Sequence, residues 1–170
     1  MLPPPNKDVA VFPRTVAGTY RMLHRPADEG FGGMNMWTAE SPDLVHWGNH
    51  RFLAAPRRGM WDCARIGAGA HPIDTPEGWL EIYHGADDSG RYCLGVMLLD
   101  GHDTSRVLAR GKDPIMEPLE PYEREGFFGD CIFTNGHVVR NGGIDIYYGA
   151  SDTVVCGASV TLDDLFDALR

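Results

Sequence analysis

The stretch GWLEIYHGAD at residues 78–87 alternates apolar and polar or aromatic positions and ends at a turn-forming aspartate. It aligns with GIDIYYGASD at residues 143–152 when one glycine is shifted and one residue is inserted, and a fainter copy is GTYRMLHR at residues 18–25. Alternation with a period of two predicts β-strands. Further short strand patterns precede the copies at 9–12, 66–70 and 131–134, follow them at 35–39, 92–99 and 154–160, and add fourth strands at 51–54 and 107–110.

Repeated units of three or four antiparallel strands are typical of β-propeller blades. We therefore expect an all-β fold in which residues 1–170 form a single partial β-propeller domain, with blades at about 6–58, 61–112 and 127–160. Closed propellers usually contain about four to eight blades, so three would leave an open wedge with exposed sheet edges. Only residues 162–169 have a helical pattern, with Thr161 as the candidate N-cap.

Composition excludes several classes of protein. The 170 residues carry a net charge of −9, which disfavours nucleic acid as a partner. No apolar run approaches the roughly 18 residues of a membrane helix, and the start MLPPPNKD lacks a signal-peptide pattern, so we expect no membrane contact and a cytoplasmic location. The four cysteines form no C-x-x-C pair, and no metal site is expected. The serine hydrolase, zincin and P-loop motifs are absent from the sequence.

Three cations are candidates for an anion site. Residues 1–60 have a net charge of +2 although the whole chain is acidic, which places an anion site in the first part of the chain. Lys7, Arg25 and Arg65 each lie at the start or end of a predicted strand, and the corresponding ends of inner strands converge on one mouth of a propeller. Arginine offers a planar fork for phosphate, and lysine adds a point charge. Isolated surface salt bridges are the alternative for each residue.

Polar and aromatic residues follow the same repeats. His84 ends the second repeat, and Asp87 and Asp152 occupy similar places after the second and third. Such groups suit sugar hydroxyls, but the aspartates also suit turns held by their own side chains. Aromatic candidates for a stacking face are Tyr83, Phe128, Phe133 and Tyr148, for which core packing is the alternative.

Seven strings in order along the chain resemble glycoside hydrolase family 130, which contains the β-mannoside phosphorylases. They are NKDVAVFP (6–13), LHRP (23–26), SPDLVHW (41–47), WDCARIGAG (61–69), GWLEIYHGAD (78–87), GFFGD (126–130) and YYGASD (147–152). The resemblance implies a five-bladed β-propeller that cleaves β-linked mannosides with inorganic phosphate as co-substrate, inverts the anomeric centre and releases α-mannose 1-phosphate. It implies no metal and no organic cofactor.

The resemblance also implies roles for individual residues. Phosphate-binding residues would be Lys7, Arg25, Arg65 and His84, and sugar-binding residues would be Asn6, Tyr83, Asp87 and Asp152. The family's general-acid aspartate precedes the NKD-like string, so we expect no residue of this chain to take that role and expect little turnover from the chain alone. This sequence also departs from the family at Cys63, where relatives tend to carry serine, and at Asp130, where they tend to carry asparagine.

Two alternatives remain open from the sequence. A β-mannosidase of the same fold would use water in place of phosphate. A non-catalytic sugar-binding half-propeller would complete its ring with a second copy or with a complementing N-terminal half. The presence of all three cations favours phosphorolysis, because an anionic nucleophile needs no general base but needs positive charge to hold it below the anomeric carbon.

Overall fold

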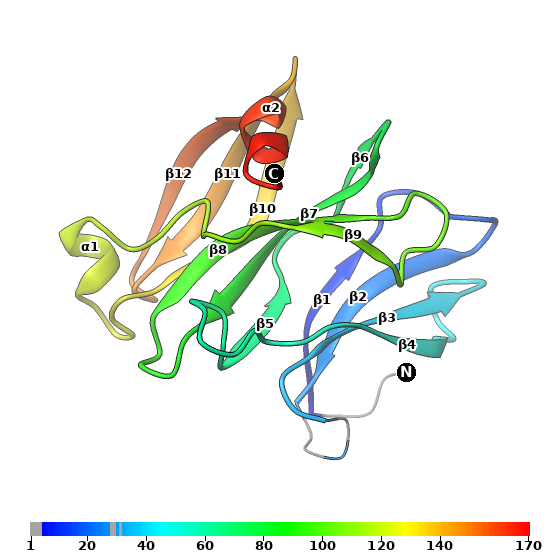
Figure 1. The fold of residues 1–170 in the computed structure, drawn as a ribbon, viewed down its shortest axis with the longest axis horizontal. Helices are drawn as coiled ribbons and strands as arrows, with labels where there is room; N and C mark the ends of the chain where they lie inside the picture. Colours follow the sequence, from blue (N-terminus) through cyan, green and yellow to red (C-terminus); the bar gives the residue numbers. More distant parts are fainter. Residues whose placement is uncertain (1–4, 28–29, 31) are drawn as a thin grey trace.

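The computed structural model describes residues 5–27, 30 and 32–170, which form three antiparallel β-sheets (Figure 1). The first sheet has four strands in sequential order, each paired to the next by the meander that the sequence pattern predicts. Its strands are β1 (Asn6–Val11), β2 (Tyr20–Pro26), β3 (Met36–Ser41) and β4 (Gly48–Ala54).

The second sheet occupies the middle of the molecule (Figure 1). Its strand order is β5-β7-β8-β9, and β6 pairs with the first half of β7. The strands are β5 (Arg65–Ala68), β6 (Ile73–Thr75), β7 (Gly78–Ala86), β8 (Tyr92–Leu99) and β9 (Val107–Arg110).

The third sheet contains β10 (Ile132–Arg140), β11 (Gly143–Ala150) and β12 (Val154–Thr161). Helix α2 (Leu162–Asp167) follows it directly, and Thr161 caps the helix as predicted by accepting a hydrogen bond from the Asp164 amide. A second short helix, α1 (Pro121–Arg124), was not predicted. Four residues are too few to produce an apolar period, so only its Pro121 start carried a signal. The all-β expectation is confirmed.

Strand β7 separates two hydrophobic cores, and all nine of its residues are buried. Alternate side chains of a strand point to opposite faces of its sheet. Trp79 and Tyr83 therefore pack into the core shared with the first sheet, while Leu80 and Ile82 pack into the core shared with the third. Burial on both faces fits the mostly apolar run from Trp79 to Tyr83.

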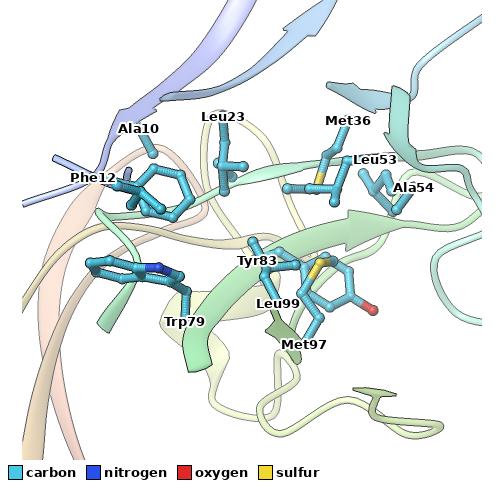
Figure 2. Close-up of a cluster of buried hydrophobic side chains, with 13 residues drawn as sticks. Ala10, Phe12, Leu23, Met36, Leu53, Ala54, Trp79, Tyr83, Met97 and Leu99 are labelled. Carbon is cyan, nitrogen blue, oxygen red and sulfur yellow. The ribbon is translucent and has the colours of Figure 1, made fainter. Parts of the chain in front are cut away.

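The first core joins the first and second sheets (Figure 2). Ala10, Phe12 and Leu23 face Trp79 across this interface, and the rings of Phe12 and Trp79 meet edge to face with centroids 5.0 Å apart. The second core joins the second and third sheets and includes Leu165 of α2, which has no exposed surface. Because burial of apolar area is the main stabilising contribution, these cores fix the relative position of the three sheets.

Several large apolar side chains of the first and third sheets remain exposed. Val9, Val11 and Phe52 of the first sheet are at least 38% exposed, and Val155 on β12 is 83% exposed. Monomeric proteins rarely leave broad apolar faces in water, so these residues are available to a further packing partner. Among the described residues, no helix has the length and apolar character needed to cross a membrane.

Candidate active site

A pocket of about 420 Å³ lies where the three sheets meet. Lys7, Asp8 and Arg25 come from the first sheet, and His84 and Tyr92 come from the second. The third sheet and its flanking turns complete the lining with Phe128, Cys131, Phe133, Asn135 and Asp152. The predicted convergence of strand ends therefore brings four of the predicted site residues together, namely Lys7, Arg25, His84 and Asp152.

The cations Lys7 and Arg25 stand directly opposite each other on β1 and β2. Cross-strand partners point to the same face of a sheet, so both side chains reach the pocket. Lys7 is exposed, whereas Arg25 is only 6% exposed and donates from Nη1 to the Ile66 carbonyl at 3.3 Å. This side of the pocket therefore carries two positive charges, one on the buried Arg25 guanidinium and one on the exposed Lys7 ammonium.

His84 lines the pocket and is buried. Its ring packs against Phe133 with centroids 4.2 Å apart, and its Nε2 atom lies 3.2 Å from Asp8 Oδ2. Burial lowers the pKa of His84, and the neighbouring Asp8 opposes that shift in part. The Asp8 oxygen also lies 2.9 Å from Arg25 Nη1, so one carboxylate contacts two of the predicted anion-binding side chains.

Arg65 contacts the pocket indirectly, through Tyr92. Its Nη1 donates to the Tyr92 hydroxyl at 3.2 Å, and its guanidinium lies over the Tyr92 ring with 5.8 Å between guanidinium carbon and ring centroid. Tyr92 lines the pocket and Arg65 does not. Arg65 Nε is buried without a hydrogen-bond partner among the described residues, which leaves a donor beside the pocket wall.

Three predicted sugar-binding residues lie outside this pocket, and Tyr83 is the clearest correction. Tyr83 neighbours His84 on β7 and so points to the opposite face, into the first core. Its hydroxyl donates to Asp62 at 2.8 Å, accepts from Arg110 at 3.0 Å and lies 3.3 Å from Arg57. Burial raises the pKa of this phenol. Tyr83 is therefore a core residue in this structure.

Asp87 and Asn6 are likewise engaged elsewhere. Asp87 Oδ1 accepts from the Ser89 amide and hydroxyl and from the Arg91 amide, which is the turn-holding alternative noted from the sequence. Asn6 Oδ1 lies 3.3 Å from His24 Nδ1 and does not line the pocket. Among the aromatic candidates, Phe128 and Phe133 line the pocket, while the Tyr148 hydroxyl donates to Glu123 in the interior.

Sequence reasoning missed four pocket residues, which are Asp8, Tyr92, Cys131 and Asn135. Asp8 follows Lys7 on the same strand, and simple alternation would send it to the other face. A register shift between Lys7 and Ala10 and a φ of 55° at Asp8 turn its side chain into the pocket. Burial raises the pKa of Cys131 to about 12, so this thiol stays protonated near neutral pH and is a poor nucleophile.

The lining combines cations with carboxylates and aromatic rings. Lys7, Arg25 and the neighbouring Arg65 can hold an anion, and Asp152 can accept hydrogen bonds from hydroxyl groups. Phe128 and Phe133 supply apolar surface to the lining. In the part of the chain that the structure describes, no cluster of three or more histidine, cysteine, aspartate or glutamate side chains is placed to hold a metal ion.

The chain is similar to known mannoside phosphorylases. The chain is 43% identical over 167 residues to the beta-1,2-mannobiose phosphorylase of Listeria innocua, covering 98% of this chain and 47% of that protein. It is 41% identical to the 1,2-beta-oligomannan phosphorylase of a Thermoanaerobacter species, covering 97% of this chain and 54% of that protein. The solved complex of the Listeria innocua enzyme with beta-1,2-mannobiose superposes with a TM-score of 0.96 over 98% of this chain and 47% of that one.

The chain thus spans about half the length of the curated relatives it matches. Residues 4–170 match the sequence model of one family, described as beta-1,4-mannooligosaccharide phosphorylase. With a match over nearly all 170 residues and 43% identity to a member, the chain belongs to glycoside hydrolase family 130.

Proposed function

We propose that this chain supplies the phosphate-binding half of a β-mannoside phosphorylase, and that the pocket receives inorganic phosphate as co-substrate. The observation that supports this most directly is the convergence of Lys7, Arg25 and His84 on one pocket, with Arg65 behind Tyr92. The names of the relatives point to β-linked mannosides as the other substrate. The products would be α-mannose 1-phosphate and the shortened acceptor.

The proposed chemistry is a single inverting displacement. A phosphate oxygen attacks the anomeric carbon as the bond to the leaving oxygen breaks, and a general acid protonates that oxygen. Because phosphate is already anionic, the site needs cations to align it and no general base. Lys7 and Arg25 would orient the phosphate, and Asp152 would hold hydroxyl groups of the mannose. We assign the general acid to no residue of this chain, and propose that a segment outside these 170 residues supplies it.

The proposal needs neither a metal nor an organic cofactor, because phosphate is the nucleophile, the cations align it and a general acid protonates the leaving oxygen. It also includes a second protein segment, either a complementing N-terminal half or another copy of the chain, that would pack on the exposed apolar residues of the outer sheets. We propose a cytoplasmic location, with which the four free cysteines are compatible because reducing compartments keep thiols unpaired.

Phosphate binding can be tested on the 170-residue chain by ³¹P NMR titration and calorimetry. We expect saturable binding that Lys7→Gln weakens about tenfold, because a charge-assisted contact to phosphate contributes roughly 1.4 kcal/mol or more. Lys112→Gln is the matched control, since Lys112 is exposed and lies away from this pocket. Absence of binding, or an equal loss in both variants, would refute the phosphate site.

Turnover is tested with β-1,2-mannobiose, β-1,4-mannobiose and mannosyl-glucose, each with and without phosphate. Mannose 1-phosphate that forms only with phosphate present supports a phosphorylase. Free mannose released at the same rate with and without phosphate identifies a β-mannosidase, and saturable sugar binding without product identifies a non-catalytic module. Activity that appears only after a longer chain or a complementing half is added would support the assignment of the acid to another segment.

A further inference from the structure

The proposed phosphate pocket contains a carboxylate against its own cations. Asp8 Oδ2 is buried 2.9 Å from Arg25 Nη1 and 3.2 Å from His84 Nε2. The Arg25 contact is an ion pair, whereas burial lowers the pKa of His84, and neither contact has the alignment of a hydrogen bond. A fixed negative charge beside an incoming anion opposes its binding through Coulomb repulsion. Asp8 must therefore either lower the affinity of the pocket for an anion or raise it by holding Arg25 and His84 in place.

Local backbone geometry is adapted to this contact. The bulge of β1 and the φ of 55° at Asp8 bring two successive residues, Lys7 and Asp8, into the same pocket. Aspartate adopts this left-handed conformation more readily than most residues. The conformation costs free energy, so the contacts of the Asp8 side chain have to compensate for it.

Gly67 on β5 provides the space for the same contact. A Cβ atom at this position would collide with the Asp8 carboxylate and with the imidazole of His84. Gly67 is paired with His84 in the ladder between β5 and β7, so a larger residue cannot avoid the clash by turning away. The contact between the Asp8 carboxylate and the His84 imidazole therefore depends on three strands. The bulge of β1 directs Asp8, β7 carries His84, and Gly67 of β5 leaves the space that both side chains occupy.

We propose that Asp8 is a positioning residue of the phosphate pocket: its carboxylate fixes the Arg25 guanidinium and keeps a proton on His84 Nε2, so that phosphate meets a guanidinium that is already oriented. This inference rests on the proposed phosphate site. An unprotonated Nε2 would set its lone pair against the carboxylate, so the proposal places the ring proton on Nε2. Arg25 Nε is buried and has no hydrogen-bond partner among the described residues.

The variant Asp8→Asn separates positioning from simple electrostatics. Removing a negative charge from an anion site strengthens binding if Asp8 acts only through its charge. Positioning predicts the opposite, a phosphate dissociation constant that rises about tenfold, because Asn cannot hold Arg25 and His84 as a carboxylate does. Asp74→Asn is the control, since it removes the same charge from the Arg14–Asp74 pair outside the pocket. Unchanged or tighter binding in Asp8→Asn overturns the proposal.

Gly67→Ala tests the geometry without changing any charge. The added methyl group displaces Asp8 and His84, and phosphate affinity should fall as it does in Asp8→Asn. Gly48→Ala on β4 is the matched control, because a Cβ there meets no atom within 4 Å. If Gly67→Ala folds and binds phosphate as tightly as Gly48→Ala, the proposed positioning is wrong.

A third measurement needs no variant. Long-range ¹H–¹⁵N correlation spectra of the unmodified chain at neutral pH report which nitrogen of His84 carries the proton. A protonated Nε2 supports the proposal, and an unprotonated Nε2 overturns it whether or not phosphate binds. If the chain binds no phosphate at all, the phosphate site itself fails, while the tautomer of His84 still decides the Asp8 contact.

Discussion

The Tyr83 hydroxyl donates a 2.8 Å hydrogen bond to Asp62, a carboxylate with no exposed surface. Arg57 and Arg110 form ion pairs with the same carboxylate at 2.8 and 2.5 Å. These four side chains tie the loop between the first and second sheets to β7 and β9. A buried carboxylate with this many donors is an anchor of the fold.

Removal of the Asp62 carboxylate should therefore destabilise the chain strongly. We expect Asp62→Ala to lower the free energy of unfolding by about 3 kcal/mol, because it leaves two partly buried guanidinium groups without their partner. Tyr83→Phe should cost about 1 kcal/mol, since it loses one hydrogen bond and keeps the ring. Urea unfolding followed by tryptophan fluorescence measures both. Equal midpoints for Asp62→Ala and the unmodified chain would contradict this assignment.

Glu81 should make stability fall as pH rises. It is fully buried, one carboxylate oxygen accepts from the Gly69 amide at 3.1 Å, and the other has no hydrogen-bond partner among the described residues. Burial raises its pKa well above the usual value, so the folded state holds a proton that the unfolded state releases above its ordinary pKa. Stability from this group is complete at acidic pH and declines toward alkaline pH.

The variant Glu81→Gln removes that titration. Because the unpaired amide has its own burial cost, the informative quantity is the change with pH. The free energy of unfolding of Glu81→Gln relative to the unmodified chain should increase from pH 5 to pH 9. Parallel stability curves over that range would show that Glu81 does not titrate in this way.

His24 should make stability fall as pH drops. Burial and the neighbouring His50 lower its pKa from 6.5 to about 4. Its Nδ1 lies 3.3 Å from Asn6 Oδ1 and its Nε2 lies 3.2 Å from His50 Nδ1, so a second ring proton would face the His50 donor. The lowered pKa means that stability is complete above pH 6.5 and is lost toward pH 4.

Thermal unfolding at pH 7 and pH 5 tests this effect. His24→Gln should lose less stability on acidification than the unmodified chain, and His102→Gln, on an exposed loop, should lose as much as the unmodified chain. If the unmodified chain, His24→Gln and His102→Gln all lose the same stability on acidification, groups other than His24 cause the loss.

Gly95→Ala should destabilise the second sheet. A Cβ at Gly95 would lie 2.6 Å from the Trp61 ring and 2.8 Å from the Tyr83 ring, which stack with centroids 5.5 Å apart. Overpacking of this kind costs about 1–3 kcal/mol, although glycine to alanine in a strand is otherwise favourable. Gly48→Ala, with open space around it, should leave the midpoint of urea unfolding unchanged or raise it. Similar midpoints for the two variants would argue against the clash.

The strand pattern of the sequence predicted the sheets well because most strands are buried on at least one face. β7 is buried on both faces and β11 alternates buried and open positions, and both produced clear signals. The short helix α1 produced no periodic signal, since one turn has no period to detect. The three-residue strand β6 was missed for the same reason.

The site was predicted in part. Lys7, Arg25, His84 and Asp152 were predicted from their place at strand ends, and the structure brings them together. Tyr83 was predicted as a sugar-binding residue but lies in the first core, because the repeat shows that a residue lies on a strand but not which face of the sheet it occupies. Asp8 was missed because a bulge changes the direction of a side chain, and its left-handed backbone has no pattern in the surrounding residues.

The walls of the pocket come from three separate sheets, and this gives any bound anion a mechanical effect. Such an anion stabilises both interfaces between the sheets, because separation of any one sheet would destroy its binding site. At a concentration about one hundred times its dissociation constant, the anion would raise the free energy of unfolding by about 2.7 kcal/mol. Amide hydrogens in all three sheets would then exchange more slowly together, which makes the occupancy of the pocket a measure of the cooperativity of the whole chain.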